Sequence, residues 1–133
     1  NASIADPMAS PATSVGYIVT GTDLNNCTNS DTVEVAVNAL PIVTAGNDVD
    51  ICEGDNTQLL AAGAVSCVWS PMDSLTDSNI SNPFANPTIT TEYIVTGTDA
   101  NLCNNTDTVI VTVNPLPILT TSSDTSMCIN DTI

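Results

Sequence analysis

The chain has 133 residues and a formal net charge of −15, because 15 residues are acidic and none is Lys, Arg or His. Without a side-chain cation it cannot neutralise phosphate groups, which excludes nucleic acid as a partner and an anionic membrane surface as a binding site. A Ser or Cys nucleophile would also lack a nitrogen base, and no carboxylate pair suited to acid–base catalysis stands out from the general acidity, so we expect that the protein is not an enzyme.

Hydrophobic residues make up 42% of the chain, enough for a folded core rather than a disordered acidic tail. Val, Ile and Thr stand between turn-forming Asn, Asp, Gly and Pro, which is typical of short strands joined by loops. No window has a helical period, and the longest nearly apolar stretch, 59–65, is too short to span a bilayer. The composition therefore predicts an all-β fold with no membrane insertion.

The first expected strand begins at Tyr17, in a sequence that occurs twice. Residues 17–23, Tyr-Ile-Val-Thr-Gly-Thr-Asp, recur unchanged at 93–99, an offset of 76 residues. The same offset pairs Pro7 with Pro83, Pro11 with Pro87, Cys27 with Cys103, Asp31 with Asp107, Leu40 with Leu116 and Cys52 with Cys128. These matches predict tandem repeats with a period of 76 residues.

Repeat boundaries are expected near Asn38 and Asn114, where a Val-rich strand meets a Pro-containing linker. They divide the chain into the C-terminal part of a first repeat (1–38), a complete β-sandwich repeat (39–114) and the N-terminal part of a third repeat (115–133). The two incomplete parts cannot fully complete each other, because both lack a counterpart of 58–76, which includes Trp69. We therefore expect the polypeptide to continue at both ends.

Within residues 39–114 the expected strands are short. They lie at 41–45, 49–52, 57–62, 67–70, 88–90, 93–98 and 108–113. In the last of them, Val109, Val111 and Val113 alternate with other residues, a period of two that marks a strand with one buried face. A polar loop, 99–107, precedes it. Many short strands with turn signals between them predict an immunoglobulin-like sandwich.

Trp69 is the single Trp of the chain and is expected on a central strand. A lone Trp between Val68 and Ser70 is more often part of a core than a platform for a ligand, so we assign it to the core with the three alternating valines. The platform is an alternative, and it would make the sandwich a carbohydrate-binding module. Exposure of Trp69 and Phe84 on one face would favour that alternative.

Four segments of the complete repeat form a characteristic set. They are Leu-Pro-Ile-Val-Thr-Ala-Gly (40–46), Ile-Cys-Glu-Gly-Asp (51–55), Val-Trp-Ser-Pro (68–71) and Tyr-Ile-Val-Thr-Gly-Thr-Asp-Ala-Asn-Leu-Cys (93–103). With them the whole chain resembles the PKD-like, immunoglobulin-type repeats of very large Bacteroidota surface proteins, which include gliding-motility adhesins and other cargo of the type IX secretion system. Cys67 departs from that pattern, in which an aromatic residue is usual.

The resemblance implies an extracellular or cell-surface location and a structural role. The protein would be a stalk or fibre that holds an adhesive tip away from the cell or binds surfaces itself. Its partners would be neighbouring repeats of the same chain, other fibre chains, and glycans of cell surfaces or of a substratum.

Glycosylation of this chain is a further expectation. The resembled proteins attach O-glycans at Asp-Ser or Asp-Thr followed by an apolar residue or Thr, which implies candidate sites at Thr32, Ser74, Thr108 and Thr132. Asn-x-Ser/Thr sequons occur at Asn1, Asn26, Asn79, Asn104 and Asn130. Such tripeptides also arise by chance in a chain this rich in Asn and Thr.

The polar loop after each Tyr-containing strand is a candidate calcium site. It offers Asp23, Asn25, Asn29 and Asp31, and again Asp99, Asn101, Asn105 and Asp107. Calcium takes six to eight oxygen ligands, of which closely spaced Asp and Asn side chains can supply several. Turn formation explains the same residues, because Asp and Asn bond their own backbone, and we favour it. No other cofactor is expected.

Five cysteines in a short chain favour an oxidising compartment, and the absence of His and of Cys-x-x-Cys argues against a zinc site. Two classes match across the repeat, Cys27 with Cys103 and Cys52 with Cys128. If the classes lie at opposite ends of the sandwich, each can form a disulfide with the other class of a neighbouring repeat, whose cysteine would lie outside residues 1–133. A Cys52–Cys103 bridge within one repeat is the alternative, and it requires a different topology. Free buried thiols are a less favoured alternative outside the cell.

Overall fold

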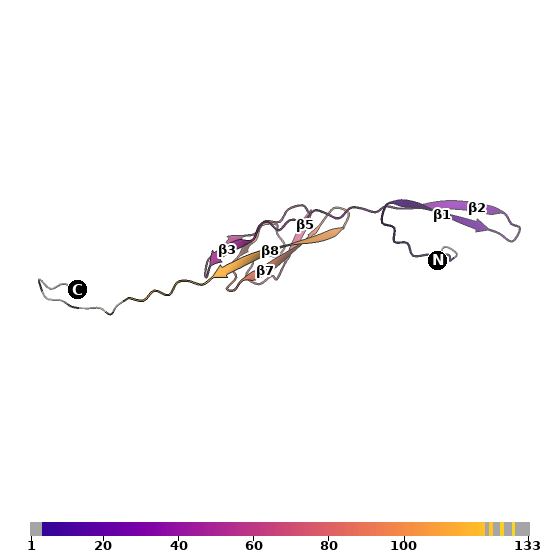
Figure 1. Cartoon of the computed structure of the whole chain (residues 1–133). Coiled ribbons are helices and arrows are strands. Elements are labelled where there is room, and N and C mark those ends of the chain that lie inside the picture. The colour runs from indigo at the N-terminus through magenta and orange to yellow at the C-terminus, as the bar shows by residue number, and fades with distance from the viewer. Residues whose placement is uncertain (1–3, 122, 124–125, 127–128, 130–133) are drawn as a thin grey trace.

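The structure, a computed structural model, describes residues 4–121, 123, 126 and 129. In that part of the chain there is no helix, and the fold is all-β (Figure 1). The strands in chain order are β1 (Val15–Thr22), β2 (Thr28–Val35), β3 (Val49–Cys52), β4 (Thr57–Gln58), β5 (Ser66–Ser70), β6 (Phe84–Ala85), β7 (Thr91–Thr98) and β8 (Asn104–Asn114). Among the described residues, therefore, no helix has the length and hydropathy of a membrane span.

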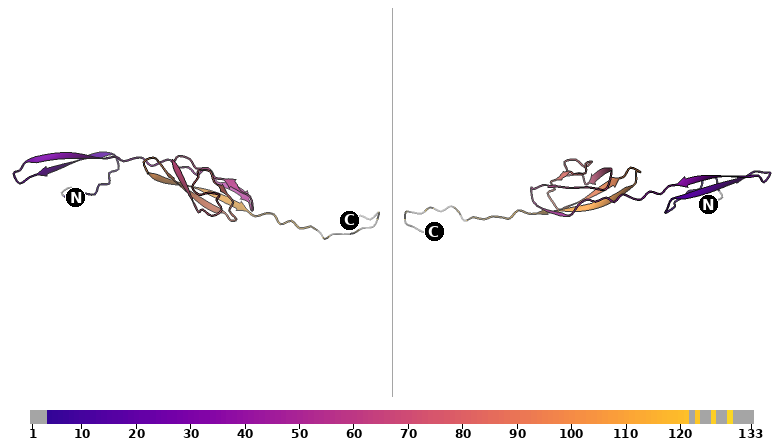
Figure 2. Two further views of the ribbon diagram at one scale, coloured as in Figure 1. Left: turned by 180° about the vertical axis from the view of Figure 1, so that it is seen from behind. Right: turned by 90° about the horizontal axis from the view of Figure 1, so that it is seen from above.

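β1 and β2 pair antiparallel and form the N-terminal hairpin. β3, β8, β7 and β5 form a four-stranded sheet in that order, with β3 parallel to β8 and the other pairs antiparallel. β4 and β6 form a separate antiparallel pair. We call residues 43–114 the main body, and Figures 1 and 2 show the N-terminal hairpin lying apart from it. The layers of the main body are consistent with a β-sandwich.

The core of the main body follows the alternation of half-buried strands, because inward side chains are buried and their neighbours are exposed. β5 buries Cys67 and Trp69, and β7 buries Tyr93 and Val95. The core is completed by Val43, Ala45, Ile51, Leu59, Pro83, Ala85, Val109 and Val111, with Val113 partly buried. These residues come from both layers, so one core holds the two sheets of the main body together.

The second layer is less regular than its sequence predicts. Segments 41–45, 57–62 and 88–90 are predicted as strands, but of these residues only Thr57 and Gln58 lie in one. The partner of β4 is instead β6, which stands between Pro83 and Pro87. Proline has no N–H to donate to a ladder, which explains why this pair is only two residues long.

The predicted loop 99–107 is wrong at its C-terminal end. β8 begins at Asn104, and residues 104–107 pair with β7 as far as Asp107, which lies opposite Val95. Asn and Asp have low strand propensity, but pairing with an adjacent strand overrides it. The loop between β7 and β8 is therefore 99–103.

The N-terminal hairpin and the β7–β8 hairpin have the same register. Tyr17 lies opposite Val33, and Tyr93 lies opposite Val109 at the corresponding position. Both turns are closed in the same way, because one oxygen of the Asp that begins each turn accepts two backbone N–H groups. The pairs are Asn25 N and Cys27 N to Asp23 Oδ1, both 2.8 Å, and Asn101 N and Cys103 N to Asp99 Oδ1, 2.8 and 2.9 Å.

The bases of the two hairpins also match. The Ser14 hydroxyl accepts Val37 N at 2.9 Å, and the Thr90 hydroxyl accepts Val113 N at 3.0 Å. In each turn one residue adopts positive φ, Asn26 at 64° and Leu102 at 63°. The two segments therefore form the same hairpin with different residues at one strained position.

The positive φ of Leu102 carries a strain that Asn26 avoids. An L-residue with a large side chain loses about 1–2 kcal/mol in this conformation, whereas Asn tolerates it. We expect Leu102→Asn to raise the free energy of unfolding of the main body by about 1 kcal/mol, because the side chain of Leu102 is exposed and contributes little packing. Thermal denaturation followed by circular dichroism measures the gain. Leu102→Ala is the control, and an equal gain from it would contradict the backbone explanation.

The chain enters and leaves the main body at opposite ends of β8. At its first residues, the Asn105 side-chain amide donates to Pro41 O at 3.1 Å. At its last residue, Asn114 O accepts Glu53 N at 2.9 Å, beside Cys52. Between these points residues 41–52 run alongside β8 in the same direction, and after Asn114 the chain continues away from the sheet (Figure 2). The long axis of the main body is thus also the direction of the chain.

Candidate functional site

The β7–β8 turn does not gather the predicted calcium ligands. The carboxylate of Asp99 is bonded to its own turn, and Asp107 Oδ2 instead accepts Ala45 N at 2.8 Å. Asp107 lies three positions into β8, about 10 Å along the strand from Asn104 at roughly 3.3 Å per residue. The structure therefore separates Asp99 from Asp107 and uses both to hold backbone amides.

The N-terminal hairpin gives the same result. Asp23 closes its turn, and Asp31 Oδ1 accepts Thr32 N at 2.8 Å. In the β7–β8 hairpin, the side-chain amide of Asn105 donates to Pro41 O at 3.1 Å. In the part of the chain that the structure describes, no group of three or more His, Cys, Asp or Glu side chains is placed to hold a metal ion.

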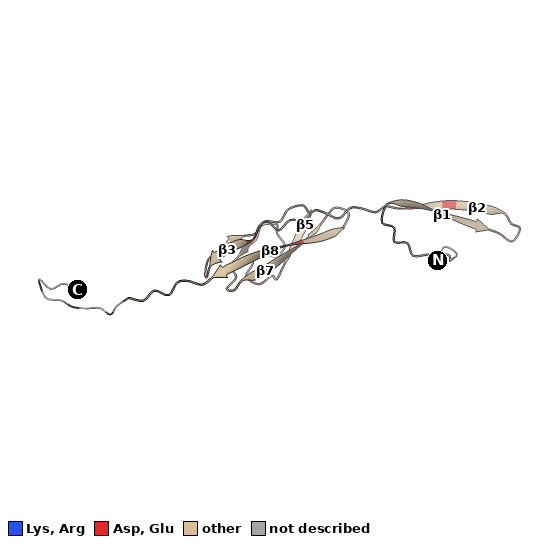
Figure 3. Ribbon diagram, in the orientation of Figure 1, with Lys and Arg blue, Asp and Glu red and all other residues tan. Residues whose placement is uncertain are grey.

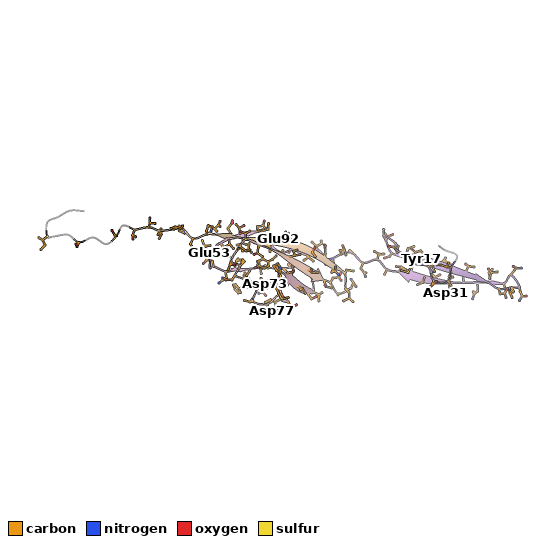
Figure 4. All side chains as sticks on the ribbon, turned by 90° about the horizontal axis from the view of Figure 1, so that it is seen from below. Tyr17, Asp31, Glu53, Asp73, Asp77 and Glu92 are labelled. Atoms are coloured by element: carbon orange, nitrogen blue, oxygen red, sulfur yellow. The ribbon has the colours of Figure 1, made fainter. Side chains whose placement is uncertain are left out.

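The remaining acidic side chains are distributed over the surface rather than concentrated. Figure 4 shows Asp73 and Asp77 on one side of the main body, in the loop after β5, with Glu53 and Glu92 on the other side. Asp77 Oδ1 accepts Asn79 N at 2.8 Å, another turn-forming bond. Figure 3 marks acidic positions in red along the ribbon, and the sequence has no Lys, Arg or His to pair with them.

Two backbone amides stabilise the charged form of Asp107. The N–H of Ala45, and secondarily that of Thr108, hold the pKa of the Asp107 carboxyl below its ordinary value of 3.8, while desolvation opposes them weakly. The bond to Ala45 joins β8 to the segment that precedes β3, across 62 positions of the sequence. Asp107 is therefore a structural link between the first and last segments of the main body.

This link predicts an acid sensitivity of the main body. Because the pKa of Asp107 is lower in the folded state, its stabilisation is present above the ordinary value of 3.8 and is lost as pH falls through the folded pKa. We expect Asp107→Asn to lower the thermal midpoint at neutral pH and to weaken its decline in acid. Asp31→Asn, at the matching position of the N-terminal hairpin, is the control. A decline in acid that is as steep in Asp107→Asn as in the unchanged chain would contradict the assignment.

The cysteine classes lie at opposite ends of the main body. Cys52 pairs with Asn114 at the end of β8, and Cys103 directly precedes Asn104 at its beginning. The 11 residues of β8 place these ends about 30 Å apart, whereas bridged Cα atoms lie within about 7 Å. A Cys52–Cys103 bridge within one main body is therefore wrong. No disulfide joins the described cysteines, and Cys128 lies outside the described residues.

Cys67 belongs to neither class. It is buried in the core, and its position in β5 lies opposite Gly97. A Cβ at Gly97 would lie 2.6 Å from side-chain atoms of both Val43 and Ala64, so the backbone of β7 is closely covered there. The small thiol of Cys67 thus lies in a closely packed part of the core.

The Tyr93 hydroxyl is a buried polar group without a hydrogen-bond partner among the described residues. Burial, and then the nearby Asp73 carboxylate, raise the pKa of Tyr93 above its ordinary value. Both effects keep the phenol neutral. Tyr93 therefore serves as a large core side chain.

The candidate glycosylation positions are accessible where the structure describes them. Thr32 and Thr108 lie on the outward faces of β2 and β8, and Ser74 lies in an exposed loop with φ of 66°. Of the sequon residues, Asn26, Asn79 and Asn104 are exposed. Thr132, Asn1 and Asn130 lie outside the described residues.

The two aromatic side chains of the carbohydrate-binding alternative do not share an exposed face. Trp69 is 1% exposed, and its indole Nε1 donates to Ile80 O at 3.0 Å in the interior. Phe84 is partly exposed beside a hollow lined also by Asn56, Ser74, Leu75, Thr76 and Asn86. Asn86 already donates to Asp55 O at 2.7 Å. The arrangement offers a sugar one aromatic side chain rather than a platform of two.

Comparison with known proteins gives no match, either to a protein-family model or to a curated protein. The features that bear on function are therefore the geometry of the strands, the direction of the chain and the distribution of charge.

Proposed function

We propose that this chain is a structural segment of a long extracellular or cell-surface adhesin or filament, built from tandem PKD-like sandwich repeats of 76 residues. In such a protein the segment acts as a stalk or surface-adhesion fibre. Its contacts are with neighbouring repeats, other fibre chains, and glycans of a cell surface or substratum.

The observation that carries this proposal is the position of the chain at the two ends of the main body. Pro41 is held at the first residues of β8, and the chain leaves at Asn114, the last residue of β8. A module with its ends at opposite poles lengthens a molecule each time it is repeated, whereas adjacent ends would fold the chain back. Tandem units of this kind behave as a quasi-one-dimensional array.

The shared geometry of the two hairpins supports the repeat. They agree in strand register, in the turn closed by Asp23 or Asp99, and in the backbone N–H that the Ser14 or Thr90 hydroxyl accepts. Independent segments have no reason to share all three. The unbalanced charge of −15 supports an extended form, because like charges on successive units repel.

Surface labelling of intact cells tests the location and the role together. Antibodies raised against residues 39–114 should label unpermeabilised cells of the source organism, and external protease should remove the signal. Deleting the gene should reduce attachment of the cells to a surface. Labelling that requires permeabilisation would refute the proposal. Labelled cells whose attachment is unchanged after deletion would refute the adhesive role alone.

A further inference from the structure

The N-terminal hairpin exposes a face that the matching hairpin buries. Tyr17, Val19 and Val33 are 40, 64 and 60% exposed, whereas Tyr93, Val95 and Val109 at the same positions are 0, 0 and 1% exposed. Figure 4 shows Tyr17 on the hairpin, away from the main body. An uncovered row of aliphatic and aromatic side chains on a two-stranded hairpin is a surface that requires a partner.

The main body shows what covers such a face. β5 adds antiparallel to β7, with Trp69 opposite Val95, and β3 adds parallel to β8, with Val49 opposite Val111. Buried residues between and beside these strands fill the remaining space; they are Val43, Ala45, Ile51, Leu59 and Cys67. All of these covering groups belong to the segment 39–76.

The residues ahead of the N-terminal hairpin lack the same partner. In the main body, Pro83 O accepts Leu59 N at 2.9 Å, and β6 pairs with β4. At the matching positions, Pro7 has no described bond of this kind, and Met8 is exposed and outside any strand. The N-terminal hairpin and the residues ahead of it, which include Pro7 and Met8, thus lack the strands that cover their counterparts in the main body.

We call the face of the N-terminal hairpin that carries Tyr17, Val19 and Val33 its inner face. We propose that this inner face and both edges of the hairpin bind a segment with the residue pattern of 39–76, located in the same polypeptide ahead of residue 1. This segment adds a parallel strand beside β2, with its counterpart of Val49 opposite Val35. It adds an antiparallel strand beside β1, with its counterpart of Trp69 opposite Val19. The inference rests on the proposed function, because tandem repetition places such a segment there.

A second copy of the chain fits this face less well. The covering segment of another copy is already packed against its own β7–β8 hairpin, so binding would first require opening a buried core. Each copy also carries a charge of −15, which opposes association. A covering segment in the same polypeptide avoids both costs and benefits from a high effective concentration.

The test restores the segment in the protein itself. Residue 77 corresponds to residue 1, so a copy of 39–76 is joined directly ahead of Asn1 in the full chain. Hydrogen exchange read by mass spectrometry should then show that residues 15–35 exchange as slowly as 91–114, at least 100-fold slower than in the chain without the addition. The added Trp should also emit at a shorter wavelength, as a buried indole does.

Matched variants identify the face that is bound. In the extended protein, Val33→Glu on the inner face should restore fast exchange of 15–35, whereas Thr32→Glu on the outward face should not. Protection of 91–114 in every variant shows that the main body is folded. Fast exchange of 15–35 in the extended protein, with 91–114 protected, would overturn the proposal.

The occupant is tested separately in the chain without the addition. Sedimentation should show a monomer at all concentrations, with residues 15–35 unprotected. Protection of 15–35 that rises with concentration would identify a second copy as the occupant and overturn the proposal. None of these outcomes depends on where the protein is located or whether it supports attachment, so failure here is distinct from failure of the proposed function.

Discussion

Replacing Trp69 with Ala is expected to lower the free energy of unfolding of the main body by about 3–5 kcal/mol. The side chain is 1% exposed and lies at the centre of the core, so truncation leaves a cavity in addition to the lost transfer free energy. It also removes the bond from Nε1 to Ile80 O. Since small domains are stable by about 5–15 kcal/mol, this change removes a large part of the total.

Urea denaturation followed by far-UV circular dichroism measures this loss, because the variant has no Trp fluorescence. Val68→Ala is the control on the same strand, where the side chain points outward and is half exposed. We expect it to change stability by less than about 1 kcal/mol. Similar losses in the two variants would show that Trp69 does not have the central packing role assigned to it.

Gly63→Ala is expected to lower the free energy of unfolding of the main body by about 2–5 kcal/mol, from two additive causes. The residue has φ of 88°, a conformation that costs an L-residue about 1–2 kcal/mol. An added Cβ would also overlap the backbone of Ile42, at 1.7 Å from its carbonyl oxygen. A backbone group cannot move aside as a side chain can, so overpacking adds about 1–3 kcal/mol.

Gly54→Ala separates the two causes. Gly54 has φ of 92°, but an added Cβ there meets no atom within 4 Å. Its substitution should therefore cost only the conformational part, about 1–2 kcal/mol. The difference between the two variants in urea denaturation measures the overlap with Ile42. Equal losses would mean that the segment at Ile42 adjusts freely and does not pack closely on Gly63.

The sequence predicts the central strands well because their alternation is regular. Tyr93, Val95, Val109 and Val111 recur at a period of two, and this pattern indicates both β7 and β8 and their buried face. The β4–β6 pair is too short to show a period, and the prolines beside β6 conceal it. The regular strands β7 and β8 can thus be predicted from the local sequence pattern. The β4–β6 pair cannot, because it depends on contacts between segments that are distant in the sequence.

Prediction of the candidate site from the sequence is limited in the same way. Asp99 and Asp107 occur at a spacing that suits either a cation or a turn, and nothing local distinguishes the two. The distinguishing contact is the bond from Ala45 N to Asp107, between residues that only the topology brings together. The position of Cys52 relative to Cys103 likewise follows from the parallel pairing of β3 with β8, which periodicity does not predict.

That parallel pairing determines how the main body responds to a pulling force. A force applied through the two ends of the chain draws Pro41 and Asn114 apart along β8 and loads the contacts between 41–52 and β8 in shear. These contacts include the β3–β8 ladder and the bonds from Ala45 N to Asp107 and from Ile110 N to Asp48. In shear they must break together, whereas bonds pulled from one end open one at a time. The topology therefore gives the main body a mechanical clamp, aligned with the direction in which the chain enters and leaves it.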